Sequence, residues 1–219
     1  MKINMLRIAV VTCLVLVGLQ KGYSQGTFVN LDFESVIPPL NPDLNFSVPI
    51  TSALPGWTGY INGNPRDRVS YDSISLGGPS ISLLDSLSPF PSLRPIQANN
   101  SVYLKSFSDA GGSSAGIGQT GQIPSGALSL LFLMADPYLS VSFAGQPIPL
   151  VQFGTSGSYT IVGGDISMFA GQTGELRFVG TGFFDDIQFS NQSIPEPGTF
   201  GLFGLGAFLL GWRFGCRRT

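Results

Sequence analysis

The sequence predicts an all-β fold, an antiparallel β-sandwich set between two hydrophobic end segments. Three observations carry this prediction. The chain holds 29 Gly and 16 Pro among its 219 residues, and only 11% of its residues are charged. Hydrophobic residues make up 43%, enough for a packed core and too many for a disordered chain. Short apolar runs separated by turn residues are typical of strands joined by tight connections.

The candidate strands begin near residue 27 and continue to residue 189. They cover residues 27–34, 101–107, 128–134, 139–143, 148–153, 158–162, 175–179 and 183–189. Residues 35–100 contain ten prolines, so we expect long loops there with a few short strands between them. One helical turn is expected at residues 166–170, ended by Gly171. Strands at this spacing most often form a two-sheet sandwich.

Charge and residue usage exclude several functions. Residues 25–190 hold five basic and twelve acidic side chains, a formal balance of −7. An acidic body without a basic patch is a poor partner for nucleic acid. The chain has no histidine, which excludes Ser-His-Asp catalysis and His-ligated zinc. Its two cysteines, Cys13 and Cys216, lie in the end segments, so the middle has no disulfide or thiolate site.

The N-terminal 24 residues have the layout of a secretory signal peptide. Lys2 and Arg7 precede an apolar run at residues 8–19, and small residues follow near Ser24. As a helix this run is about 18 Å long, which is short for a membrane crossing. We expect cleavage after Ser24; an uncleaved anchor is the alternative.

The C-terminal segment, residues 191–219, predicts a membrane crossing. An apolar, Gly-rich stretch covers residues 198–214, about 25 Å as a helix. The basic end at 213–219 carries Arg213, Arg217 and Arg218, which the positive-inside rule keeps in the cytoplasm as a stop-transfer signal. Both ends then point inward and residues 25–190 lie outside. A plain anchor helix is the simpler alternative.

The tripeptide before this stretch adds a specific signal. Pro195, Glu196 and Pro197, followed by the apolar span and the basic end, resemble the PEP-CTERM sorting signal of bacterial surface proteins. The resemblance implies that an exosortase, a membrane enzyme, recognises and cleaves this region after export. It also implies transient anchoring in the inner membrane and delivery to the cell surface or extracellular matrix.

A second resemblance concerns the ectodomain. Phe33-Glu34, Leu54-Pro55-Gly56-Trp57, the stretch 165–172 and Phe184-Asp185-Asp186-Ile187 look like parts of galactose-binding-like jelly-roll domains and carbohydrate-binding modules. These pieces occur in the same order as in such domains. The resemblance implies a jelly-roll-like sandwich, and it does not identify a ligand.

The same resemblance implies a structural calcium ion. In such modules an N-terminal Phe-Glu and a C-terminal Asp-Asp often meet across neighbouring strands. Glu34 with Asp185 or Asp186 is therefore the metal hypothesis, because carboxylates suit Ca²⁺. The alternative is that these acids cap strand ends or lie in solvent.

The aromatic residues suggest a sugar-binding platform, and the acids suggest paired catalytic carboxylates. Trp57, Tyr60 and Tyr71 are a candidate platform for stacking on a sugar ring, although Trp57 also suits a core. Asp185 and Asp186 are neighbours on a strand and point to opposite faces, so they cannot flank one glycosidic bond. A hydrolase would need a partner such as Glu175 or Asp165, and nothing in the sequence selects either.

We therefore expect a non-enzymatic exported protein of the bacterial surface or matrix, whose partners are the export machinery and an exosortase. The first alternative is a carbohydrate-binding module acting on exopolysaccharide. The second alternative is a glycan-active hydrolase. We expect no cofactor apart from the calcium ion of the metal hypothesis.

Overall fold

The computed structural model describes residues 25–88, 94–107, 112–157 and 159–194. These residues form an all-β molecule, as the sequence predicted. The strands are β1 (Ser47–Pro49), β2 (Thr58–Ile61), β3 (Asn64–Arg66), β4 (Arg68–Tyr71), β5 (Ser80–Asp85), β6 (Asn100–Lys105), β7 (Ala115–Gln122), β8 (Ser129–Phe143), β9 (Gln146–Ile148), β10 (Val151–Ser156), β11 (Tyr159–Asp165) and β12 (Thr173–Ser190). A short helix, α2 (Ile50–Ala53), and a 3-10 helix, η2 (Ser167–Phe169), complete the described elements.

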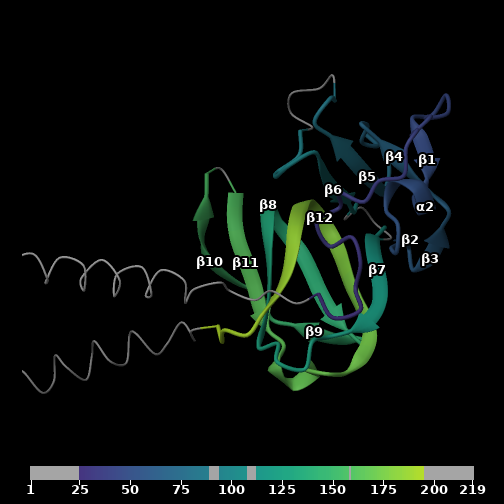
Figure 1. Ribbon diagram of the computed structural model, residues 1–219. Helices are drawn as coiled ribbons and strands as arrows, with labels where there is room; N and C mark the ends of the chain where they lie inside the picture. Colours follow the sequence, from purple (N-terminus) through teal and green to yellow (C-terminus); the bar gives the residue numbers. More distant parts are fainter. Residues whose placement is uncertain (1–24, 89–93, 108–111, 158, 195–219) are drawn as a thin grey trace, which may run out of the picture.

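The strands pair along two long ones, β8 and β12 (Figure 1). The first half of β12 pairs with β7 on one side and with the end of β8 on the other. Its second half pairs with β6 and with the start of β8. Strands β2 and β3 extend from β7, strands β5, β4 and β1 extend from β6, and β11 and β10 extend from the start of β8. All pairs are antiparallel except β4 with β5.

A sharp bend in β12 turns this continuous sheet into two facing layers. Phe178 and Phe184 stack at 4.9 Å between ring centroids, although six residues of straight strand span about 20 Å. The bend lies at Gly180, whose φ is +139°, and a register shift follows at Thr181/Phe183. A Cβ on Gly180 would lie 2.0 Å from the backbone oxygen of Tyr138, so only glycine fits there.

The core between the layers is mainly aromatic. Phe178 meets Phe132 edge-on at 5.4 Å, and Phe184 meets Phe33 edge-on at 5.5 Å. Trp57 packs against both Phe33 and Phe178. Each such side chain, when fully buried, stabilises the fold by roughly 1.5–3 kcal/mol relative to an exposed one. Together these rings hold the two halves of β12 face to face.

The segment at residues 27–34 is not the strand that its pattern predicted. Asn30 and Phe33 adopt left-handed backbone conformations, with φ of 52° and 56°, which break an extended run. The Gln119 side chain replaces a strand partner here: it accepts from the Val29 N–H and donates to the Val29 carbonyl. The Ile187 N–H donates to the Leu31 carbonyl at 3.0 Å. The segment therefore closes the sandwich as an irregular edge.

Other expected elements differ in their limits. Residues 128–134 and 139–143 join into β8, and residues 175–179 and 183–189 join into β12. The expected strand at 148–153 is divided between β9 and β10. Residues 35–100 hold the expected short strands, but also the parallel β4–β5 pair. The expected turn at 166–170 is η2, and Gly171 follows it with φ of +75°.

The predicted signal peptide at 1–24, the motif Pro195–Pro197, the predicted span at 198–214 and the basic end at 213–219 all lie outside the described residues. Within the part of the chain that the structure describes, no helix is long and apolar enough to cross a membrane.

Candidate functional site

Two of the three predicted metal ligands bind the same loop, between Ile96 and Ser101. Glu34 accepts the N–H groups of Asn99 and Asn100 at 2.9 and 2.8 Å through Oε1. Its Oε2 accepts from the side-chain amides of the same two residues at 3.2 and 3.3 Å. The Glu34 carboxylate therefore clamps this loop onto the N-terminal segment.

Asp185 binds the loop from the other side, inside the protein. It is 1% exposed, and its Oδ2 accepts from the Ser101 hydroxyl at 2.6 Å and from the Gln97 N–H at 3.3 Å. Its Oδ1 accepts from the Asp186 N–H at 2.7 Å. Burial raises the pKa of the Asp185 carboxyl to about 7, against these hydrogen bonds, which favour the ionised form.

In this arrangement hydrogen-bond donors surround the carboxylates of the calcium hypothesis. N–H and O–H donors occupy the carboxylate oxygens of Glu34 and Asp185, where a cation would need bare oxygens. Asp186 adopts a φ of 51° and lines a surface groove, as expected for a neighbour on the opposite face. No cluster of three or more Asp, Glu, His or Cys suited to a metal occurs among the described residues. In the structure Glu34 and Asp185 are hydrogen-bond acceptors and Asp186 is a groove residue, and the calcium site stays a prediction.

The three aromatic residues of the predicted sugar platform do not share a surface. Trp57 is 4% exposed, and its Nε1 donates to the Asn30 carbonyl at 2.9 Å. Trp57 is therefore a core residue, which was the alternative to the platform. Tyr60 lies on β2 and Tyr71 on β4, in different layers. The Tyr71 hydroxyl donates to Asp85, and burial together with this bond raises the pKa of the hydroxyl.

Tyr60 belongs to a polar cluster that the sequence did not reveal. Its hydroxyl donates to Glu175 Oε1 at 2.8 Å, and the Arg177 guanidinium lies 4.0 Å from the centre of its ring. Arg177 and Glu175 form a half-buried ion pair at 3.0 Å. The other candidate acid, Asp165, accepts the Ser167 N–H at 2.8 Å at the start of η2, and this bond lowers the pKa of Asp165.

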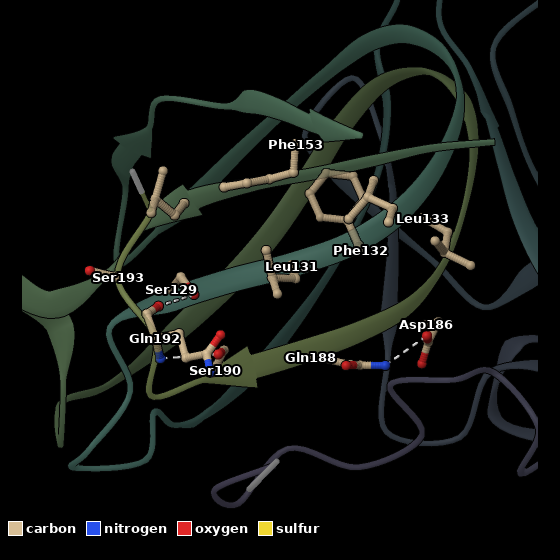
Figure 2. A pocket seen from close by; sticks show the side chains of 12 residues that line it. Ser129, Leu131, Phe132, Leu133, Phe153, Asp186, Gln188, Ser190, Gln192 and Ser193 are labelled. Atoms are coloured by element: carbon tan, nitrogen blue, oxygen red, sulfur yellow. Dashed lines mark hydrogen bonds between the residues drawn. The ribbon is translucent and has the colours of Figure 1, made fainter. Parts of the chain in front are cut away.

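A groove of about 390 Å³ lies on the outer face of the second half of β12 (Figure 2). We call it the exit groove. Strands β8, β10, β11 and β12 contribute to it together with the residues after β12. Its lining consists of Ser129, Leu131, Phe132, Leu133, Phe153, Ile161, Asp186, Gln188, Ser190, Gln192, Ser193 and Ile194.

Strand alternation explains the apolar floor of the exit groove. On β8, Leu130, Phe132 and Met134 are buried, while Leu131 and Leu133 on the opposite face are half-buried. Phe153 is 38% exposed on the edge strand β10. Figure 2 shows Leu131 between Phe153 and the pair Gln188–Asp186, in which Gln188 Nε2 donates to Asp186 Oδ2 at 2.7 Å. The signal available in the sequence was an apolar run on β8 that leaves both faces apolar.

The C-terminal end of the described chain runs along this groove. The Ser129 hydroxyl donates to the Gln192 carbonyl at 2.8 Å, and the Gln192 N–H donates to Ser190 Oγ at 3.1 Å (Figure 2). Ser193 and Ile194 follow as lining residues. The folded body therefore holds the chain to within three residues of Pro195.

Comparison with known proteins identifies the segment that leaves the groove. Residues 193–218 match the family model described as the PEP-CTERM protein-sorting motif, as the sequence predicted. The match starts at Ser193, so Ser193 and Ile194 belong both to the motif and to the groove lining. No curated protein matches the sequence of the chain.

Solved structures give only distant likenesses. An apo-form cyclase from Fischerella sp. has a TM-score of 0.40 and 17% identity, covering 77% of this chain and 96% of that one. A Stig cyclase from Fischerella sp. TAU in complex with an indole compound has a TM-score of 0.40 and 16% identity, covering 77% and 98%. Arabinose-bound MgGH51 α-L-arabinofuranosidase has a TM-score of 0.30 and 15% identity, covering 76% and 27%.

Proposed function

We propose that this chain is an exported protein of the bacterial cell surface or extracellular matrix, sorted by its PEP-CTERM motif and processed by an exosortase. The observation that carries the proposal is the match at residues 193–218, which begins where the folded body ends. A signal peptide at 1–24 directs export, and the span at 198–214 holds the protein transiently in the inner membrane. Cleavage near Pro195–Pro197 then releases the sandwich.

The proposed role of the sandwich is structural rather than enzymatic. Its jelly-roll-like character is supported by two layers that share β8 and β12. A non-enzymatic role is supported by the chain's lack of histidine and by hydrogen bonds that engage Glu175, Asp165 and Asp185. The absence of turnover across a panel of polysaccharides would agree with this role, and sustained turnover would replace it with a hydrolase.

The sorting role is tested by Glu196→Ala in the native host. The variant removes the single acid of the tripeptide, so we expect full-length or signal-cleaved protein to accumulate in the membrane fraction. Asn191→Ala, two residues before the matched range, is the control and should be processed normally. Normal release of the Glu196→Ala protein would overturn the proposal.

A second candidate function is binding of an exopolysaccharide in the exit groove. Phe153 offers an exposed ring for stacking beside the hydrogen-bonding pair Gln188 and Asp186. Because Trp57 is a core residue, Trp57→Ala would report on folding rather than on binding. Polysaccharide pull-down with Phe153→Ala is the cleaner test. Binding that is lost in this variant supports the candidate, and the absence of binding by the unmodified protein excludes it.

A further inference from the structure

The proposed cleavage region lies close in sequence to a folded surface. Among the described residues, the hydrogen bond nearest the C-terminal end joins the Ser129 hydroxyl to the Gln192 carbonyl at 2.8 Å. Even a fully extended chain from Gln192 reaches Pro195 within about 10 Å. An enzyme that binds the tripeptide therefore works within about 10 Å of the exit groove, close enough for its surface to contact this face of the sandwich.

The groove is suited to a protein contact of this kind. Leu131, Leu133, Ile161 and Phe153 present apolar surface, and among the described residues Asp186 is the one charged side chain in the lining. Residues 151–164, which include strand β10, carry no charge at all. Anionic lipid headgroups would require Lys or Arg, and none lines the groove within the part of the chain that the structure describes. The complementary surface is apolar, with one donor for Asp186.

We infer that the exit groove is a docking site for the processing enzyme, separate from the tripeptide that the enzyme cleaves. This inference rests on the proposed sorting function and deepens it. The enzyme reads two features, the motif and the adjoining face formed by β8, β10, β11 and β12. The ectodomain is then part of the recognised substrate, and its contact raises the effective concentration of the motif at the enzyme.

The first test measures processing in the native host by pulse-chase labelling. Phe153→Asp places a charge in the groove, and we expect processing to slow about tenfold, the equivalent of about 1.4 kcal/mol of lost contact. Leu44→Asp is the matched control, because Leu44 is 99% exposed and does not line the groove. Both purified variants must keep the melting temperature of the unmodified protein; if Phe153→Asp does not, Leu131→Ser takes its place.

The second test inserts six Gly and Ser residues between Ile194 and Pro195. If the enzyme docks in the groove, the insertion slows processing, because the groove and the motif no longer engage together at their natural distance. If the sandwich makes no contact with the enzyme, processing stays the same or becomes faster, since the insertion moves the sandwich away from the enzyme. That outcome overturns the inference.

The Glu196→Ala variant distinguishes a failure of the docking site from a failure of the sorting function. The docking site is overturned, and the sorting function stands, if processing is blocked in Glu196→Ala but normal in both Phe153→Asp and the insertion variant. Normal processing in Glu196→Ala sinks the sorting function itself. A Phe153→Asp protein that is processed normally but no longer binds vesicles, polysaccharide or a second copy of the chain assigns the groove to that other occupant. That result also overturns the inference.

Discussion

Asp185 is the residue whose environment departs most from that of an ordinary carboxylate. It is buried against the loop 96–101, and its pKa is raised to about 7 from 3.8. A raised pKa means that the folded state holds this proton more tightly than the unfolded state does. The contribution to stability is therefore fully present below pH 3.8 and is lost as the pH rises through 7.

Replacing Asp185 with Asn should remove this pH dependence. Over the window from pH 4 to 8, the unfolding free energy of the unmodified protein should fall relative to that of Asp185→Asn, by up to roughly 4 kcal/mol. Urea unfolding at one-unit pH steps measures the difference. The raised pKa of Asp72, which also follows from burial, affects both proteins equally.

Asp165 supplies a control of the opposite sign. Hydrogen bonds from Ser167 lower the pKa of Asp165, so its contribution is present above pH 3.8 and is lost as the pH falls below this value. Asp165→Asn should thus flatten the acid side of the stability curve. Parallel curves for the unmodified protein and Asp185→Asn would contradict the placement of Asp185.

For single residues, the sequence predicted which face of a strand a side chain occupies better than it predicted the partners of that side chain. Alternation placed Asp185 and Asp186 on opposite faces correctly. The calcium and platform hypotheses depend on the partners of Glu34 and Trp57, and those partners come from distant segments that the local sequence does not reveal. The left-handed conformation of Phe33 also had no local signal, since bulky residues rarely adopt it.

At the scale of elements, the loop 96–101 depends on Glu34. Glu34→Ala leaves the N–H groups of Asn99 and Asn100 without their acceptor, so we expect a loss of about 1–3 kcal/mol of unfolding free energy. Asp32→Ala, at an exposed neighbour, should cost much less. Thermal melts of the unmodified protein with EDTA and with added Ca²⁺ should coincide. A calcium-dependent rise in melting temperature would restore the metal site.

The bend of β12 depends on Gly180. Ala at this position would place a Cβ 2.0 Å from the Tyr138 backbone oxygen at a φ of +139°, and we expect a loss of about 2–4 kcal/mol. Gly126→Ala is the control, because no atom lies within 4 Å of its Cβ position. Equal melting temperatures for the two variants would show that the bend tolerates a side chain.

Gly180 and Gly182 explain why the boundaries of the strands were predicted less well than their presence. Gly180 and Gly182 looked like a loop between two strands, whereas the chain uses them to bend one continuous strand. The local pattern of apolar residues was sufficient for strand content. It could not distinguish a break from a bend, because the pairing of β12 with β6, β7 and β8 decides between them.

At the scale of the whole molecule, the chain joins a sorting signal directly to a folded sandwich. The matched motif begins at Ser193, three residues after β12 ends at Ser190. The order of motif, apolar span and basic end was readable from sequence because it is local. The exit groove was not, because strands β8, β10, β11 and β12 assemble it from residues 129 to 194.

Intact mass spectrometry of the mature protein from its native host tests the central claim most directly. We predict a chain that begins near residue 25 and ends between residues 194 and 197, with any attached group adding to this mass. A full-length C-terminus at Thr219 in the mature, surface-delivered protein would contradict processing at the motif.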